Sequence, residues 1–493
     1  MNIKNKVGAG ILNAITESLY DNPIVVFREY VQNSVDAFKH LNNNNNSQVK
    51  IIYHTDSNTS SLCFLDNGSG IIENKFLEKM TSIGASFKIQ TEDVGYKGIG
   101  RLSGISYCDT LYFLNILDFH ENSFQIYKID CNAYRSLKKN SNLSEMDFAA
   151  LMDSIGSFLQ SKDEIDAFIQ SRNLNLLFSQ NGDMYNSSNS GFLVIMENLS
   201  PLLTDVIREK DFMNNLGWLL PVDFENECFS NQRYRDAMEY ITKTIPDSLR
   251  SYDITFNNQP ILRPIKKDTL RSYSIVKNLD YGFMLLNFNN DRMIIDKKNI
   301  FSGIKVYLDN FLLCDENELI PSLARYRFLK SSSTNEMIQS CRTIGGIIYI
   351  SSKSLIFANA RRTFVEVYDS DSLNFLNNVG SCIAKINETR YSLSRLHSEI
   401  KKVDKNQTRV DMLLQRANEH LAALTNFDCP IDDTFLKSEQ NFEDLSPDEQ
   451  KKLLKKKIST VIDKYINEFI EQYSVSDYQT ASDDFFLWLK NKV

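Results

Sequence analysis

The sequence PIVVFREYVQNSVDAFKHL occupies residues 23–41, and its helical periodicity separates two chemically different faces. At 100° per residue from Val31, one group of apolar side chains lies within about 40° of a single line along the helix. These residues are Ile24, Phe27, Val35 and Phe38. Glu29, Asn33 and Asp36 lie at about 140° to 200°. A carboxamide oxygen can bind Mg²⁺ and a carboxylate one turn away can take a proton from water. The alternative is that this polar face is simply exposed to solvent. When the helix is considered without any other motif, this alternative is favoured.

The second feature is LCFLDNGSGI at residues 62–71, an apolar strand that ends in Asp66 and the glycines Gly68 and Gly70. Glycines let the backbone turn sharply and approach a ligand, and a carboxylate at a strand end can accept a hydrogen bond from a base amino group. An ordinary Asx turn explains the same residues nearly as well.

Two glycine-rich motifs follow, IGASFK at residues 83–88 and GYKGIGRLSG at residues 95–104. Backbone amides exposed by glycines at a loop that leads into a helix can bind phosphate. The chain has no G-x-x-x-x-G-K-[ST] loop, and the motifs lack the βαβ context and downstream acid of a dinucleotide fold. Each motif alone is a weak signal, whereas their order along the chain is informative.

The ordered set E-x-x-x-N-x-x-D-A, D-x-G-x-G-I, I-G-x-S-x-K and G-x-x-G-I-G-R resembles the nucleotide site of the GHKL ATPase superfamily. This superfamily includes heat-shock chaperones, MORC proteins, MutL, type II topoisomerase ATPase subunits and histidine kinases. The resemblance implies an α+β fold with a Bergerat-type α/β sandwich ATPase domain, and ATP and Mg²⁺ as ligands. Histidine kinases are the poorer match, because their corresponding helix commonly lacks the glutamate at position 29.

The resemblance also implies a role for each matching position. Glu29 is expected to be the general base that polarises the attacking water, and Asn33 is expected to hold Mg²⁺ against the phosphates. Asp36 in the same motif is expected to belong to the nucleotide-binding site. Asp66 is expected to receive the adenine amino group. The remaining expected nucleotide contacts are Gly68 and Gly70 at the base pocket, then Gly84, Ser86, Lys88, Gly95, Gly98, Ile99 and Gly100 along an ATP lid.

One position departs from the family pattern. GFLVIMENL at residues 191–199 looks like a family strand whose threonine supports the adenine through its hydroxyl, but this chain has Phe192 there. We therefore expect the adenine end of the pocket to be more apolar, and nucleotide selectivity stays open.

The length of 493 residues suits about three domains. We expect an ATP-binding domain over residues 1–205, an α/β transducer-like domain over 206–372 and an α-helical, partly coiled-coil region over 373–493. Apolar residues repeat in steps of three and four from Leu376 to Leu424, which predicts a long helix with a coiled-coil seam. A long helix packed on its own domain is the alternative.

The middle domain resembles the transducer of chaperone-like and MORC-like members at GIKVYLDNFLL, residues 303–313, and at ISSKSLIFANARR, residues 350–362. In the second stretch Arg361 is the closest match to the arginine that reaches the γ-phosphate, and this makes it a second expected catalytic residue. A surface basic pair with Arg362 is the alternative.

The charge balance of 55 Lys and Arg against 63 Asp and Glu gives a net charge of −8, which argues against a surface devoted to coating DNA. A local basic patch stays open, for example the stretch that contains Arg263, Lys266, Lys267 and Arg271. Eight dispersed cysteines without a C-x-x-C pair suit a reducing compartment. With no 18-residue apolar run, we expect a cytoplasmic protein that does not span a membrane.

These observations predict an ATP-hydrolysing protein that acts as a nucleotide-gated homodimer, either a clamp or a chaperone-like machine, in DNA transactions or prokaryotic defence. The alternative is a non-hydrolysing ATP sensor, a scaffold that binds a partner protein through its C-terminal helices. Glu29 argues against the alternative, because nucleotide binding alone does not require a base at that position.

Overall fold

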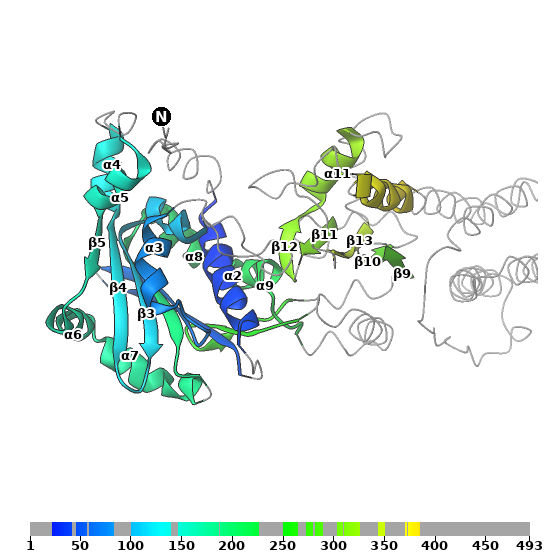
Figure 1. Ribbon diagram of the computed structural model, residues 1–493. Helices are drawn as coiled ribbons and strands as arrows, with labels where there is room; N and C mark the ends of the chain where they lie inside the picture. The colour runs from blue at the N-terminus through cyan, green and yellow to red at the C-terminus, as the bar shows by residue number, and fades with distance from the viewer. Residues whose placement is uncertain are drawn as a thin grey trace, which may run out of the picture. The chain divides into compact units, whose positions relative to one another are not determined.

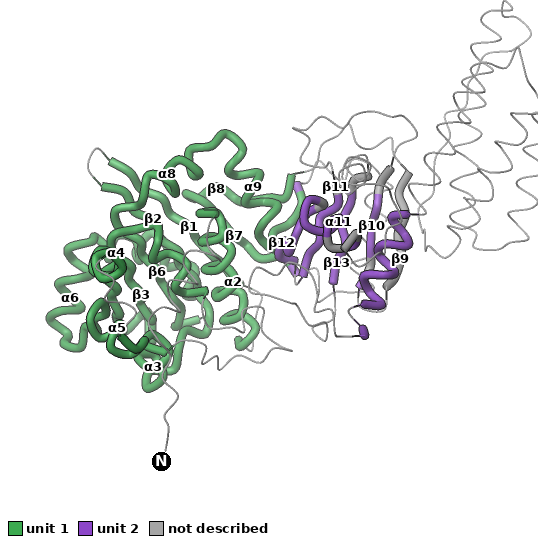
Figure 2. The backbone as a smooth tube through the Cα atoms, turned by 90° about the horizontal axis from the view of Figure 1, so that it is seen from above, with its two compact units in different colours: residues 1–224, 251–264 green, residues 225–250, 265–493 purple. Residues whose placement is uncertain are grey.

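The computed structural model forms two compact units, residues 1–224 with 251–264 and residues 225–250 with 265–493 (Figure 2). The residues that the structure describes are 22–41, 46–56, 59–82, 100–139, 146–186, 188–225, 250–264, 273–279, 282–288, 303–308, 310–325, 344–350, 370–371 and 373–384.

The first unit is built on an eight-stranded sheet with the strand order β5-β4-β3-β6-β2-β1-β7-β8, of which β3, β4 and β5 are labelled in Figure 1. Neighbouring strands are antiparallel except the parallel pair β1 and β7. The strands are β1 (Gln48–Thr55), β2 (Ser60–Asp66), β3 (Cys108–Asp118), β4 (Ser123–Asp130), β5 (Gly156–Leu159), β6 (Gly191–Leu199), β7 (Asp253–Phe256) and β8 (Gln259–Pro260). The strands expected within residues 62–71 and 191–199 are confirmed as β2 and β6.

The helices of this unit cover both faces of the sheet. They are α2 (Val25–Lys39), η1 (Glu73–Lys75), α3 (Phe76–Thr81), η2 (Gly100–Ser106), α4 (Cys131–Lys139), α5 (Phe148–Ile155), α6 (Lys162–Ser171), α7 (Leu174–Asn181), η4 (Gly182–Tyr185), α8 (Pro201–Arg208) and α9 (Phe212–Leu219). The predicted helix at residues 23–41 is confirmed as α2. Residues 146–178 contain α5, α6 and the start of α7, with β5 between the first two.

One face of the sheet packs against α2. Phe27 of α2 lies edge-on to Phe64 of β2, with ring centroids 5.6 Å apart, and to Phe212 of α9, at 5.2 Å. Successive side chains of a strand point to opposite faces, so Phe64 and Asp66 share the α2 face and Leu65 lies on the other.

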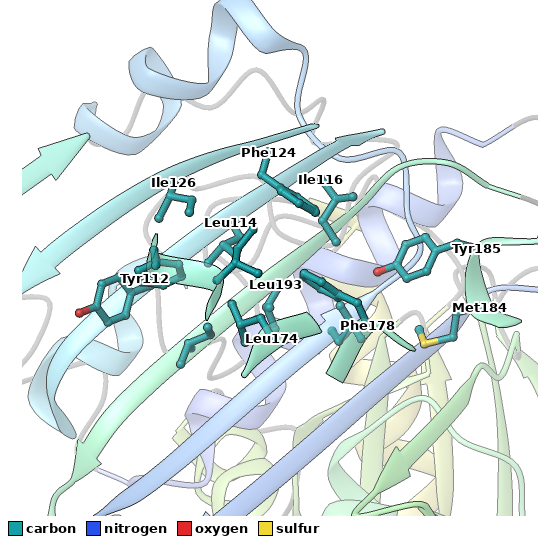
Figure 3. Packing of buried hydrophobic residues seen from close by; sticks show 14 residues of the cluster. Tyr112, Leu114, Ile116, Phe124, Ile126, Leu174, Phe178, Met184, Tyr185 and Leu193 are labelled. Carbon is teal, nitrogen blue, oxygen red and sulfur yellow. The ribbon is translucent and has the colours of Figure 1, made fainter. Parts of the chain in front are cut away.

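The opposite face carries a second hydrophobic core, shown in Figure 3. Alternate residues of β3 and β4, such as Leu114 and Ile126, meet Phe168 of α6 and Phe178 of α7 there. Phe178 stacks on Phe124 at 5.4 Å. The sheet is therefore the middle layer of three, with α2 on one face and α6 and α7 on the other.

The segment 251–264 returns to the first unit because β7 extends the sheet in parallel beside β1, with Val49 opposite Ile254. The first unit thus runs to residue 224 and regains a later segment, whereas we expected its domain to end near residue 205. Arg263 in this segment is fully buried and donates hydrogen bonds to the carbonyl oxygens of Gly217 and Leu220. The suggestion that Arg263 belongs to a basic surface patch is wrong, because its guanidinium caps the carboxyl end of α9 inside the protein.

The second unit contains a five-stranded sheet with the order β12-β11-β13-β10-β9, in which β11 and β13 are parallel. Its elements are β9 (Tyr273–Leu279), β10 (Gly282–Phe288), β11 (Gly303–Leu308), β12 (Phe311–Cys314), α11 (Glu316–Arg325) and β13 (Ile344–Ile350). The stretch GIKVYLDNFLL at residues 303–313 contains β11 and most of β12.

Residues 373–384 are helical, and Leu376, Val379 and Ile383 of the predicted apolar stripe are buried. The remainder of the expected long helix and coiled-coil seam, the basic residues Lys266, Lys267 and Arg271, and the pair Arg361 and Arg362 lie outside the described residues. In the described part of the chain, no helix is long and apolar enough to cross a membrane.

Candidate functional site

The helix α2 buries its predicted apolar face, and its polar face is also largely shielded from solvent. Phe27, Val31 and Phe38 are fully buried. On the polar side, the Glu29 side chain is only 13% exposed and Asp36 is 1% exposed. A solvent-exposed helix face does not bury its carboxylates, since burying a charge costs free energy unless other groups compensate. The solvated-face alternative therefore does not describe α2.

The carboxyl end of β2 places Asp66 against α2. Ser34 Oγ donates to Asp66 Oδ2 at 2.7 Å, and the Gly68 amide donates to Oδ1 at 2.9 Å. The Gly68 contact is the Asx turn considered from the sequence, so the turn and the buried carboxylate occur together. Burial raises the pKa of Asp66 to about 6, opposed by the hydrogen bonds from Ser34, Gly68 and the Phe192 backbone.

Two buried asparagines hold the loop that follows β2. Asn67 accepts from the Gln48 amide and donates to the carbonyl of Met184. Asn115 of β3 accepts from the Ile71 amide at 2.7 Å and donates to its carbonyl at 2.6 Å. Gly70, which lies between Asn67 and Ile71 in the chain, has φ of +61°, a backbone conformation that residues other than glycine rarely adopt. The loop is therefore rigidly held beside Asp66.

At the other end of the site, Gly100 at the start of η2 lies against Glu29. A Cβ atom on Gly100 would collide with Glu29 Oε2. The other carboxylate oxygen, Oε1, accepts a hydrogen bond from the Arg28 guanidinium at 3.2 Å. A side chain at position 100 would therefore displace the Glu29 carboxylate, and the backbone in the middle of the second glycine-rich motif reaches the predicted base.

Phe192 of β6 lies directly opposite Asp66 in the antiparallel register, so its side chain is on the α2 face of the sheet. Its ring packs near Phe76 of α3 and Phe113 of β3, with centroids 6.3 Å and 6.4 Å away. The surroundings of the Asp66 carboxylate therefore include an aromatic wall where the family strand usually has a hydroxyl.

The structure brings together Glu29, Asn33 and Asp36 on α2 with Asp66, Gly68, Gly70 and Gly100. Sequence reasoning missed Ser34 and Asn115, which hold the site from α2 and β3. Both carry a detectable signal, because each is a polar residue in an apolar setting: Ser34 borders the apolar face of α2, and Asn115 interrupts the apolar strand LYFLNIL. The predicted site residues that lie outside the described residues are Gly84, Ser86, Lys88, Gly95, Gly98, Ile99 and Arg361.

The residues present fit a nucleotide. Asp66 is a buried acceptor at one end, and the Glu29 carboxylate lies against the backbone of Gly100 at the other. Among the residues that the structure describes, no group of three His, Cys, Asp or Glu side chains could hold a metal ion. Asn33 is the predicted protein ligand of a divalent cation here, and Mg²⁺ that binds together with substrate phosphates usually has few protein ligands.

Residues 21–159 match the sequence model of a family described as "Histidine kinase-, DNA gyrase B-, and HSP90-like ATPase". Two curated relatives are described as chaperone protein HtpG, one from Polaromonas sp. (strain JS666 / ATCC BAA-500) with 30% identity and one from Polaromonas naphthalenivorans (strain CJ2) with 28% identity. Each alignment covers 21% of this chain and 20% of the relative, so the match spans about a fifth of the relatives' length.

A solved structure of the ATPase and transducer domains of DNA topoisomerase II from Balamuthia mandrillaris aligns with 10% identity and a TM-score of 0.34, covering 76% of this chain and 86% of that chain. The residues that match this family include all of α2 and β2, and both Glu29 and Gly100, which lie against each other in the structure. The predicted resemblance is confirmed over residues 21–159, which match the model of this ATPase family, and chaperone proteins are among the relatives that are similar to part of this chain.

Proposed function

We propose that the N-terminal domain binds Mg²⁺-ATP and hydrolyses it, with Asp66 at the base and Glu29 at the γ-phosphate. The observation that carries this proposal is that one helix supports both ends of the site: Ser34 holds Asp66, and Glu29 meets Gly100. Five residues of α-helix span about 7.5 Å, so the two contacts are one to two turns apart on α2.

At the base end, Asp66 accepts the hydrogen bond from the exocyclic amino group of adenine. The carboxylate already receives hydrogen bonds from Ser34 and Gly68, which fix its orientation before the base arrives. Phe192, Phe76 and Phe113 give this end an apolar surface. Because the one polar side chain proposed to contact the base is an acceptor, selectivity rests on a base that offers a donor there.

At the phosphate end, Glu29 orients the attacking water and accepts its proton. The Arg28 guanidinium holds Oε1, which leaves Oε2 on the side of Gly100. Asn33, one turn further along α2, supplies a neutral oxygen for the cation, and Gly100 supplies backbone amide surface to the phosphates. A bound Mg²⁺ ion neutralises phosphate charge, which phosphoryl transfer requires more than covalent chemistry.

For the whole chain, we propose an ATP-gated homodimer that acts as a clamp or chaperone-like machine in the cytoplasm. The relatives named as chaperones support a protein client, and the net charge of −8 gives no support to a DNA-coating surface. Arg361 is the proposed second catalytic residue, and the C-terminal helical region is the proposed docking site for a partner. A role in DNA transactions and a role in prokaryotic defence are two narrower hypotheses for this chain.

The test compares ATP binding and hydrolysis in the wild type, Glu29→Gln and Asp66→Asn. Glu29→Gln keeps the size of the side chain but cannot accept a proton, so ATP should bind while hydrolysis is lost. Asp66→Asn should lose ATP binding. Normal hydrolysis by either variant would contradict the assigned roles. The solution mass with and without a non-hydrolysable ATP analogue tests the gated dimer, and an unchanged monomer in both conditions would remove it.

The same measurements separate the enzyme from the alternative of an ATP-sensing scaffold. A wild-type protein that binds ATP, changes its oligomeric state and hydrolyses none would favour the scaffold. A wild-type rate that Glu29→Gln abolishes would favour the enzyme.

A further inference from the structure

Tyr30 follows Glu29 on α2, and its hydroxyl joins α2 to η2. The hydroxyl donates to the carbonyl oxygen of Arg101 at 3.1 Å and accepts from the amide of Gly104 at 3.1 Å. Both partners belong to η2, the element that begins at Gly100. Two adjacent α2 residues therefore meet the same short helix, Glu29 at its first residue and Tyr30 at its second and fifth.

The position of this hydroxyl is closely defined. Tyr30 is 2% exposed, and its ring lies 5.0 Å from the ring of Phe64 on β2. A Cβ atom on Gly104 would collide with the hydroxyl oxygen, so the backbone of η2 touches it directly. Burial raises the pKa of Tyr30 well above its ordinary value, and the hydroxyl therefore keeps the proton that it donates to Arg101.

A second contact holds the same part of η2. The Arg101 guanidinium donates to the carbonyl oxygen of Ser82, which follows α3. The Arg101 main chain is thus tied to α2 through Tyr30, and its side chain is tied to the end of α3. Of these two ties, only the Tyr30 hydroxyl fixes η2 relative to the helix that carries Glu29.

We propose that Tyr30 is a positioning residue for hydrolysis: its hydroxyl sets the distance between the backbone at Gly100 and the carboxylate of Glu29. This inference rests on the proposed function. Enzymes lose rate steeply when reacting groups are displaced by fractions of an ångström to an ångström, while binding that is spread over the rest of the site changes little. Removal of the hydroxyl should therefore act on the rate of hydrolysis more than on the affinity for ATP.

The experiment uses the full chain with Tyr30→Phe, which deletes one oxygen atom and keeps the ring against Phe64. We expect kcat for ATP hydrolysis to fall about tenfold while the Kd for ATP stays within about twofold. The matched control is Tyr53→Phe, since the Tyr53 hydroxyl is buried and makes no hydrogen bond with the residues that the structure describes. The control should keep the wild-type kcat and Kd.

A double variant tests whether Tyr30 acts through Gly100. Gly100→Ala forces Glu29 to move, so Tyr30→Phe should lower the rate further by much less than tenfold in that background. Circular dichroism and thermal melting establish that each variant is folded at the assay temperature.

The outcomes separate this inference from the proposed function. If the wild type hydrolyses ATP and Tyr30→Phe has an unchanged kcat, or loses ATP affinity in proportion to its rate, the positioning role is wrong and the proposed function stands. If the wild type hydrolyses no ATP, the proposed function fails and this inference fails with it.

Discussion

Ser34 Oγ lies 2.7 Å from Asp66 Oδ2 and donates a hydrogen bond to it, joining two buried side chains 32 positions apart in the chain. The bond attaches the carboxyl end of β2 to the helix that also carries Glu29. It stabilises the ionised form of Asp66 against the burial that raises its pKa. The geometry of the base end therefore depends on a residue at a position that the first nucleotide motif leaves unspecified.

Replacing Ser34 by alanine should weaken ATP binding. The Asp66 carboxylate would lose a donor worth about 1.5 to 3 kcal/mol, so the Kd for ATP should rise by about tenfold or more. Isothermal titration calorimetry measures the change. The control is Ser179→Ala on α7, where an exposed hydroxyl donates to the carbonyl of Leu176. Equal affinity in Ser34→Ala and the wild type would show that Ser34 does not prepare Asp66 for the base.

The raised pKa of Asp66 should make the free energy of unfolding of the first unit depend on pH. Its pKa rises from 3.8 to about 6 on folding, so the folded state binds more protons than the unfolded state between these values. The contribution of this group to the free energy of unfolding therefore falls as the pH rises from about 4 to 6, and levels off above 6. A shift of about two pH units corresponds to about 3 kcal/mol.

Chemical denaturation of the wild type and Asp66→Asn from pH 4 to 8 measures this contribution as the difference between the two proteins. The matched control is Glu164→Gln. The pKa of Glu164 is lowered by hydrogen bonds from the Ser161 backbone and hydroxyl, so its contribution has the opposite sign and is lost as the pH falls. A difference between wild type and Asp66→Asn that does not change with pH would contradict the prediction.

The close approach of Gly68 to α2 predicts a compensating pair of substitutions. A Cβ atom on Gly68 would lie 2.6 Å from the Cβ of Ala37, so Gly68→Ala should lower the free energy of unfolding by about 1 to 3 kcal/mol. Ala37→Gly alone should cost about 1 kcal/mol. The double variant removes the collision and should cost less than the sum of the two. Strict additivity would mean that the two residues do not press on each other in the folded protein.

The buried guanidinium of Arg263 should be a strong stabiliser of the first unit. Arg263→Met leaves the carbonyl oxygens of Gly217 and Leu220 without these donors and should lower the free energy of unfolding by about 3 kcal/mol. Arg208→Met, at an exposed position on α8, is the control and should change stability by less than about 0.5 kcal/mol. If both variants unfold alike, the prediction for Arg263 is wrong.

The sequence predicts the helices and strands that carry the site residues better than it predicts the contacts between those residues. The two faces of α2 follow from helical periodicity, and β2 and β6 follow from short apolar runs with turn residues after them. The sequence gives no sign that the segment 251–264 joins the sheet of the first unit, since the pairing of β7 with β1 joins residues about 200 positions apart and leaves no local signal. Arg263 was misread for the same reason, because burial is decided by what packs around a residue.

Local sequence alone determined the order of the nucleotide motifs, the amphipathic form of α2 and the glycines at Gly68, Gly70 and Gly100, because periodicity and backbone freedom are properties of neighbouring residues. The tertiary structure decided the partners: Ser34 for Asp66, Asn115 for the loop after β2, and Tyr30 for η2. These hydrogen bonds span from 32 to 74 positions of the chain, so they exist only once the sheet and α2 have packed together.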